Sequence, residues 1–282
     1  MACIFIAFSK QSKNAGGYDT MSRPNNSYQK KDLSLSQNFL TSQKLLQRIV
    51  RLSSITKNDT VIEIGTGKGH LTRVLSQHCK HLYSIELDQK LYAYSKQKLA
   101  DIPNLSLIHR DFLTYSLPTS GKYKVFANIP YFITTEIIRK LTEASNPPTD
   151  IWLVVEKGAA KRFMSQPKET LRSVLLKANW ESEIVYYFKR EDFHPKPAVD
   201  SVLLRLTKKD CPDVAAKDYA AFAYFIDHSF RYGLFSKRSL LTKKQISTAL
   251  RLAKLPAIPQ SGLVLYIQWL CLFRCYQQFK SG

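Results

Sequence analysis

Four consecutive residues, Asn128-Ile129-Pro130-Tyr131, have side chains and backbone properties suited to holding a nucleobase. They follow an apolar run, Val125-Phe126-Ala127, which predicts a buried strand. The Asn128 amide oxygen and the Ile129 carbonyl can both accept hydrogen bonds from an exocyclic amino group. Pro130 restricts the residue before it, which holds that carbonyl in a set direction. Because Tyr131 offers a ring for stacking, the segment predicts a site that orients the amine of an adenine.

The amine of adenine is a poor nucleophile, because its lone pair is delocalised into the ring. A site that draws this nitrogen toward tetrahedral geometry frees the lone pair for attack. The predicted chemistry is therefore a direct group transfer onto the amine. Positioning and electrostatic stabilisation at the nitrogen would supply most of the rate gain, and no strong general base is required.

A glycine-rich segment, Glu63-Ile64-Gly65-Thr66-Gly67-Lys68-Gly69, lies at an expected strand-to-helix junction. Glycines there let the backbone approach a ligand closely. The segment lacks the Gly-Lys-Ser/Thr ending of a phosphate-binding P-loop, and its Gly-x-Gly-x-Gly spacing differs from the dinucleotide fingerprint. A nucleoside cofactor without a pyrophosphate, such as S-adenosylmethionine, fits this shorter loop better.

Acidic residues follow the next two expected strands. Glu86 ends the strand expected at 82–85 and is placed to accept hydrogen bonds from both hydroxyls of a ribose. Asp111 follows the strand expected at 105–108, where it can accept from the adenine amine of the cofactor while Phe112 or Leu87 packs on the ring. Singly, such acids are more often helix caps. Ligands bind at the carboxyl ends of parallel strands, so the polar strand ends together predict one site.

Apolar runs with strand and helix spacing alternate along the chain, which predicts an α/β fold with a mainly parallel, Rossmann-like sheet. The later runs 184–188 and 199–206 are expected to close one edge as an antiparallel pair. Helices are expected at 218–230, 237–252 and 263–279. We therefore expect three parts: a disordered N-terminal arm (1–33), a catalytic domain (34–207) and a smaller all-helical RNA-binding domain (208–282).

The chain carries 42 Lys and Arg against 22 Asp and Glu, a formal net charge of +20. Such a surplus favours a polyanionic partner, either nucleic acid or an anionic membrane. No apolar run approaches the roughly 18 residues that span a bilayer, so we expect no membrane partner. Basic and aromatic residues alternate in the segment 231–254, which suits RNA contact. The alternative is an amphipathic bundle whose polar face happens to be basic.

The five cysteines are scattered and have no His or Cys partner at ligand spacing, so we expect no metal site. Free thiols indicate a reducing compartment, which here means the cytoplasm. The first eight residues are apolar, but no basic residue precedes them and no cleavage site follows, so a secretory signal is not indicated. Met21 is an alternative start to Met1, and the arm either contacts RNA phosphates or is an inert tail.

Taken together, several motifs resemble those of the ribosomal RNA adenine N6-methyltransferases. Within them the chain looks most like the Erm macrolide–lincosamide–streptogramin B resistance methylases. The resemblance covers roughly residues 35–206 and continues more weakly through the helical tail. It is carried by Ser36 to Leu40, Glu63 to Leu71, Ser84 to Asp88, Asn128 to Tyr131, and Phe193 to Pro197.

The resemblance implies S-adenosylmethionine as methyl donor, no metal, and a monomeric enzyme that acts on an adenine of 23S ribosomal RNA. One or two methyl groups could be added, with resistance to the three antibiotic classes as the result. The residues that look like the segment folding over the methionine end of the cofactor are Asn38 and Leu40. Those that correspond to the other cofactor contacts are Gly65, Glu86, Asp111 and Asn128.

The same resemblance assigns the target pocket. Asn128 and Tyr131 correspond to the residues that hold the adenine, and Phe193 looks like a second aromatic facing the flipped base. From the sequence alone, Phe193 also reads as a core anchor for the Pro-flanked loop 194–197. Both interpretations of Phe193 are open at this stage.

Two rival functions share most of these features. The dimethyladenosine transferases of the small ribosomal subunit have the same fold and most of the motifs, but modify 16S ribosomal RNA and serve ribosome assembly. The other rival is a non-catalytic nucleic-acid-binding factor on a methyltransferase scaffold. Such a factor could lose the cofactor loop, whereas Gly65, Glu86, Asp111 and Asn128 are all present here.

Overall fold

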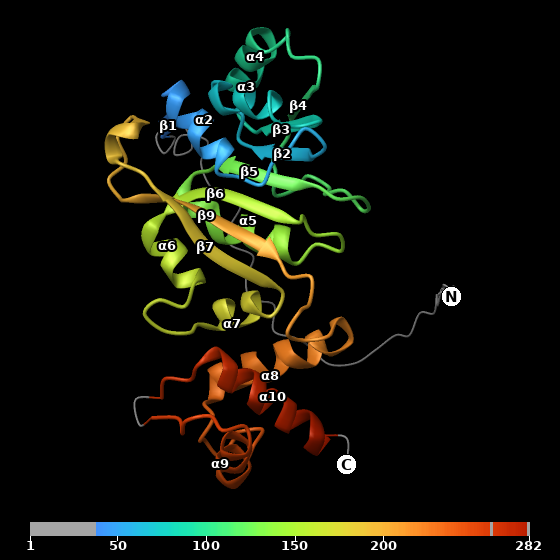
Figure 1. Ribbon diagram of the computed structural model, residues 1–282, viewed down its shortest axis with the longest axis vertical. Coiled ribbons are helices and arrows are strands. Elements are labelled where there is room, and N and C mark those ends of the chain that lie inside the picture. Colours follow the sequence, from blue (N-terminus) through green and yellow to red (C-terminus); the bar gives the residue numbers. More distant parts are fainter. Residues whose placement is uncertain (1–37, 260–261, 281–282) are drawn as a thin grey trace, which may run out of the picture. The chain divides into compact units, whose positions relative to one another are not determined.

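The computed structural model describes residues 38–259 and 262–280 (Figure 1). The expected N-terminal arm (1–33) lies outside the described residues. The boundary expected between residues 207 and 208 stays a prediction. Within the described part of the chain, no helix is long and apolar enough to cross a membrane.

A seven-stranded sheet in the order β4-β3-β2-β5-β6-β9-β7 forms the centre of the fold. Strands β2 to β6 are parallel, and β9 pairs antiparallel with both β6 and β7. This confirms the expected α/β fold and the expected antiparallel pair at one edge. The strands are β2 (Thr60–Ile64), β3 (His81–Glu86), β4 (Leu105–His109), β5 (Lys124–Asn128), β6 (Asp150–Glu156), β7 (Trp180–Tyr187) and β9 (Ser201–Lys208).

The strand order reverses between β2 and β5. From β2 the chain proceeds outward to β3 and β4, then returns to the other side of β2 to form β5 and β6. In open α/β sheets, the crevice outside the carboxyl ends of the strands at such a switch point is where ligands bind. The glycine loop after β2 and Asn128 at the end of β5 therefore lie on either side of the expected binding crevice.

Apolar residues on both faces of the central strands explain why the sheet is covered on both sides. In β5, Val125 and Ala127 join one buried cluster while Phe126 joins the other. Helices α5 and α6 contribute to the first cluster, and α2 and α3 to the second. The helices around the sheet are α2 (Gln43–Arg51), α3 (His70–Ser76), α4 (Gln89–Lys98), α5 (Thr134–Thr142), α6 (Lys157–Phe163) and α7 (Leu171–Lys177).

A second, two-stranded sheet joins segments that are far apart in the sequence. Its strands β1 (Phe39–Leu40) and β8 (Phe193–His194) run antiparallel, with Leu40 opposite Phe193. Both side chains belong to the buried cluster that also contains α2 and α3. The segment expected to fold over the cofactor is thus tied to the one expected to face the target base. Short 3-10 turns complete this part of the fold: η1 (Tyr131–Ile133), η2 (Arg190–Asp192) and, after the sheet, η3 (Ala216–Asp218).

Three helices follow the sheet: α8 (Tyr219–Tyr232), α9 (Lys243–Leu252) and α10 (Tyr266–Lys280). Two of their starts were predicted too early. Helix α9 begins at 243 rather than 237, because Thr242 caps it through reciprocal hydrogen bonds with Gln245. Helix α10 begins at 266 rather than 263, where the Gln268 side chain accepts a hydrogen bond from the Leu265 amide. Their core also includes Val174 of α7, so these helices pack on the last helix before β7.

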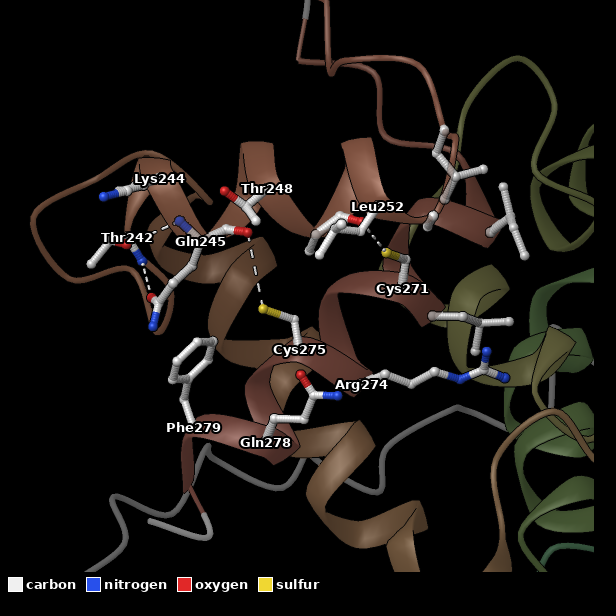
Figure 2. Close-up of a pocket in the computed structure, with 15 residues that line it drawn as sticks. Thr242, Lys244, Gln245, Thr248, Leu252, Cys271, Arg274, Cys275, Gln278 and Phe279 are labelled. Carbon is white, nitrogen blue, oxygen red and sulfur yellow. Dashed lines mark hydrogen bonds between the residues drawn. The ribbon is translucent and has the colours of Figure 1, made fainter.

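A groove of about 820 Å³ lies between α9 and α10 (Figure 2). Its lining includes the exposed Leu252, the two cysteines Cys271 and Cys275, and Phe279 near the chain end. Lysine and arginine supply the charges of the lining, since the sequence has no Asp or Glu after Asp227. Each cysteine thiol donates to a backbone carbonyl of α9. The groove belongs to the helical part and not to the carboxyl edge of the sheet.

Candidate active site

The loop after β2 takes a backbone path that only glycine follows readily. Gly65 (φ +82°) and Gly67 (φ +56°) are both in the left-handed region. A Cβ built at Gly67 would lie 2.8 Å from a ring carbon of Phe39, so the β1 segment approaches the loop closely. At Gly65 the same construction comes within 3.7 Å of the Asn128 carbonyl oxygen. The glycine loop therefore passes beside two other parts of the expected site. One is the β1 segment, expected to fold over the cofactor, and the other is Asn128, expected to hold the target adenine.

The Glu86 side chain holds this loop in place. It is 3% exposed, and its two carboxylate oxygens accept hydrogen bonds from the Gly67 amide (2.7 Å) and the Asp88 amide (2.8 Å). The Ser95 hydroxyl of α4 donates to the Gly67 carbonyl at 2.7 Å. Each carboxylate oxygen retains acceptor capacity beyond one bond. Glu86 can thus brace the loop and still accept from a ribose hydroxyl, although its contact with a cofactor stays a prediction.

Glu63 is a site residue that the sequence reasoning missed. It is fully buried in β2, and the Ser84 hydroxyl of β3 bonds to its carboxyl at 2.6 Å. The Thr66 and Ser84 hydroxyls are also 2.6 Å apart, so the chain of contacts runs from the carboxyl to the glycine loop. The pKa of Glu63 is raised to about 8, mainly by burial and in smaller part by the nearby Glu86 carboxylate. The sequence did offer a signal for this residue, because Glu63 is an acidic residue within an otherwise apolar strand.

The Asp111 carboxylate already has a hydrogen-bond partner in the turn that follows β4. Its carboxylate accepts from the Leu113 amide at 2.8 Å. Lys140 of α5 holds the same loop by donating hydrogen bonds to the carbonyls of Leu113 (2.8 Å) and Tyr115 (2.6 Å). Burial lowers the pKa of the Lys140 ammonium group. Phe112 is packed in the core beneath that lysine.

Of the two side chains expected to pack on the adenine of the cofactor, Leu87 is accessible. It is 47% exposed, whereas Phe112 belongs to a buried cluster. Leu87 follows Glu86 directly, at the carboxyl end of β3. The structure therefore places an exposed apolar side chain beside the acid expected to bind the ribose. The cofactor role of Asp111, one strand farther along the sheet, stays a prediction.

The Asn128 amide is oriented by a long-range hydrogen bond. Its Nδ2 donates to the Asn38 carbonyl at 2.9 Å, across 90 positions of sequence. With the NH2 group engaged in this way, Oδ1 is the part of the amide that can accept from an incoming amine. The bond also brings Asn38, expected over the methionine end of the cofactor, next to the expected target pocket.

Tyr131 is half-buried, and its side chain reaches from the end of β5 to the start of β9. Its hydroxyl lies 2.5 Å from the Ser201 hydroxyl at the start of β9. Ser201 in turn is opposite Glu156, the last residue of β6. Burial raises the pKa of the Tyr131 phenol, so the group stays protonated at neutral pH. The ring is held at both ends, by the backbone after Pro130 and by this hydrogen bond.

Phe193 occupies the position of a core anchor. Its side chain is 3% exposed and packs edge-on against Phe188, with ring centroids 5.3 Å apart. Its strand partner Leu40 is buried as well. Of the two interpretations left open by the sequence, this packing favours the anchor in the structure as described. A stacking role for Phe193 against the target base stays a prediction.

The site fits S-adenosylmethionine in the features that the structure shows. A left-handed glycine loop gives backbone access, a buried carboxylate lies at the end of β3, and an exposed leucine follows it. Two hydrogen bonds, Gly67 to Glu86 and Asn128 to Asn38, and the close approach of Gly65 to Asn128 bring these five residues to one edge of the sheet. Among the described residues, no group of three or more His, Cys, Asp or Glu could hold a metal ion.

Comparisons with known proteins agree with this geometry. The family of ribosomal RNA adenine dimethylases matches residues 28–253. The chain is 39% identical over 251 residues to an rRNA adenine N-6-methyltransferase of Escherichia coli, covering 89% of this chain and 98% of that protein. A protein of the same description from Enterococcus faecalis is also 39% identical, with the same coverage.

Solved structures give the same result. The 23S rRNA methyltransferase ErmE superposes with a TM-score of 0.75 and 27% identity, over 86% of this chain and 100% of that one. A dimethyladenosine transferase from Plasmodium falciparum has a TM-score of 0.63 over 83% of this chain and 86% of its own; at 22% identity it supports the fold alone. The chain belongs to the ribosomal RNA adenine dimethylase family, and within it to the Erm group of S-adenosylmethionine-dependent rRNA adenine N6-methyltransferases.

Proposed function

We propose that this enzyme methylates the N6 amine of a specific adenine in 23S ribosomal RNA, and that the product confers resistance to macrolides, lincosamides and streptogramin B. The observation that carries the proposal is the Asn128 amide, whose Nδ2 donates to the Asn38 carbonyl and leaves Oδ1 as its acceptor. The backbone carbonyl of the same residue lies 3.7 Å from a Cβ built at Gly65 in the glycine loop. The relatives named above support ribosomal RNA as the substrate, and the likeness to the 23S rRNA methyltransferase ErmE supports the choice of 23S.

In this proposal the chain contributes binding and orientation. S-adenosylmethionine, when bound, supplies a methyl group activated by its sulfonium. Asn128 Oδ1 and the Ile129 carbonyl accept hydrogen bonds from the adenine amine and draw its lone pair out of the ring. Tyr131 stacks on the base, which offsets part of the few kcal/mol that unstacking from the RNA costs, since stacking is worth ~1–3 kcal/mol per base. The amine loses its proton after it has gained the methyl group.

Expression in a macrolide-sensitive bacterium tests the proposal. We expect the wild-type chain to raise the inhibitory concentration of a macrolide, a lincosamide and a streptogramin B together, and Asn128→Ala to abolish the effect. The modified nucleotide is then mapped in 23S and 16S ribosomal RNA, and mass spectrometry of it counts the methyl groups. A modified 16S position with unchanged antibiotic susceptibility would instead assign the chain to the small-subunit dimethyltransferases.

The non-catalytic alternative requires a separate measurement. Calorimetric titration with S-adenosylmethionine is expected to show one binding site on the purified chain. Heat changes indistinguishable from dilution, together with normal RNA binding, would favour a nucleic-acid-binding factor that has kept the fold but lost the reaction.

A further inference from the structure

Tyr187 is an exposed aromatic residue at the same edge of the sheet as the candidate active site. It is the last residue of β7, and its side chain is 59% exposed. Because β7 and β6 both run antiparallel to β9, they point the same way. Tyr187 therefore lies at the carboxyl edge where β5 ends in Asn128, although β7 is separated in sequence from β5 by more than fifty residues.

The register of the strands places Tyr187 close to Tyr131. The Tyr131 hydroxyl bonds to Ser201, the first residue of β9. The next residue, Val202, is the partner of Tyr187 across the β9–β7 pair. Neighbouring strands are separated by about 4.8 Å, so the Tyr187 backbone lies about one strand spacing from the start of β9. Successive residues of β9 face opposite sides of the sheet, so the Tyr187 ring lies with Val202 on the α6 side of this edge, and the Ser201 hydroxyl lies on the other side.

Basic side chains of α6 border this tyrosine. The Lys157 ammonium lies 5.7 Å from the centroid of the Tyr187 ring. Lys161 follows one helical turn later and is also exposed, and α6 contains no acidic residue. Asp200 lies 4.0 Å from Lys157 and is also paired with Arg190, and Glu156 precedes α6, with a carboxylate oxygen beside Gly158. Exposed ion pairs of this kind are weak, so the lysines can still attract phosphates. Figure 1 shows α6 beside the ends of β6, β9 and β7.

We propose that Tyr187, Lys157 and Lys161 form a second stacking platform, which takes a nucleotide next to the target adenine in a single-stranded stretch of RNA. Pulling the target base out of its stack leaves the neighbouring base without its partner. An exposed ring beside the pocket restores that contact with any base, while cations nearby hold the backbone phosphates. The inference rests on the proposed function and names how the same site holds its RNA.

A matched control exists on the opposite half of the sheet. Tyr94 of α4 is 48% exposed, and Lys98 lies 5.3 Å from its ring centroid. The two tyrosines thus have similar exposure and a similar cation beside the ring. Their positions on the sheet differ. Helix α4 packs on β3 and β4, in the half of the sheet expected to hold the cofactor, whereas Tyr187 ends β7, in the half expected to hold the target adenine.

The test compares Tyr187→Ala, Tyr187→Phe and Tyr94→Ala in the full chain. Binding of a fluorescent single-stranded oligoadenylate is measured by anisotropy, and methylation kinetics with ribosomal RNA from a bacterium that lacks the modification. For Tyr187→Ala we expect about a tenfold or larger loss of oligoadenylate affinity and a similar rise in KM for RNA. The kcat and the affinity for S-adenosylmethionine stay at wild-type values. Tyr187→Phe retains the ring and behaves as wild type, as does Tyr94→Ala.

Lysine variants test the phosphate contacts separately. Lys161→Gln is expected to reduce the slope of log affinity against log salt by about one, whereas Tyr187→Ala leaves that slope unchanged. If Tyr187→Ala binds oligoadenylate and uses RNA as Tyr94→Ala does, the platform does not exist. A wild-type chain that binds oligoadenylate through Tyr187 but methylates no RNA would refute the proposed function while leaving the platform intact.

Discussion

The two halves of the sheet edge are built differently. On the cofactor half, at the ends of β2 and β3, the acids are buried and every bond from Glu63 and Glu86 ends on the strands or loops of the site itself. On the acceptor half, at the ends of β5 and β7, the key side chains are half-buried or exposed. The cofactor is one small molecule of constant shape, so a rigid site suits it. RNA must be unstacked and brought in from solvent, which requires accessible rings and cations.

Loss of the acceptor amide should produce the largest effect on catalysis. In the proposed mechanism Asn128→Ala removes the oxygen that orients the adenine amine, and single donors or acceptors of this kind are worth about 10²–10³ in rate. We expect the single-turnover methylation rate to fall by that amount. Affinity for S-adenosylmethionine, measured by calorimetry, should weaken less than about tenfold. Near-normal turnover would contradict the assignment of Asn128 to the adenine pocket.

The rigidity of the cofactor half can be broken at Gly67. Gly67→Ala introduces a left-handed φ strain of about 1 kcal/mol and also forces the Phe39 ring away from the loop. Gly121→Ala carries a similar strain at φ +81°, with nothing within 4 Å of the added Cβ. We expect both variants to lose stability in thermal melts, but only Gly67→Ala to lose cofactor affinity, by about tenfold or more. Equal cofactor affinity in the two would show that the contact with Phe39 is unimportant.

The buried Glu63 gives the cofactor half a pH dependence. Its pKa of about 8 in the folded chain lies above the ordinary value of 4.5. Between those values the unfolded chain releases a proton that the folded chain keeps, so the free energy of unfolding falls as pH rises. The contribution is at most about 1.4 kcal/mol per pH unit. Denaturant titrations between pH 4.5 and 8 should show this fall in the wild type and a flatter curve in Glu63→Gln.

The exposed Glu181→Gln serves as control for that series. Its curve should follow the wild type, because the Glu181 side chain is exposed and its replacement leaves the buried Glu63 in place. If the Glu63→Gln curve ran parallel to the curves of the wild type and Glu181→Gln, Glu63 would be charged in the folded chain. The short hydrogen bond from Ser84 would then have to stabilise that charge.

The smallest expected effect lies on the acceptor half. Tyr131→Phe keeps the stacking ring and removes only the hydroxyl contact with Ser201, worth about 1 kcal/mol. We expect kcat/KM for RNA to fall a few-fold, and Ser201→Ala to produce a similar fall. In the double variant the losses should not add, because both remove one contact. Additive losses would indicate that the two hydroxyls act independently.

Much of the fold was predictable from local patterns. The apolar runs at 82–85, 105–108 and 125–127 each form a strand, and the antiparallel closing pair forms as expected. These predictions succeeded because strand and helix periods are properties of short segments. The starts of α9 and α10 were wrong because side-chain caps, not apolar spacing, decide where a helix begins.

The amino-acid sequence by itself determined the fold class, the cofactor loop and the acids and amide at the strand ends, because residue type and spacing carry that information. Only the tertiary structure decided which groups meet. It paired Leu40 with Phe193, turned the Asn128 amide toward Asn38, and joined the Tyr131 hydroxyl to Ser201. Contacts across 70 to 150 positions depend on how helices and strands pack in three dimensions, and no local pattern records that packing.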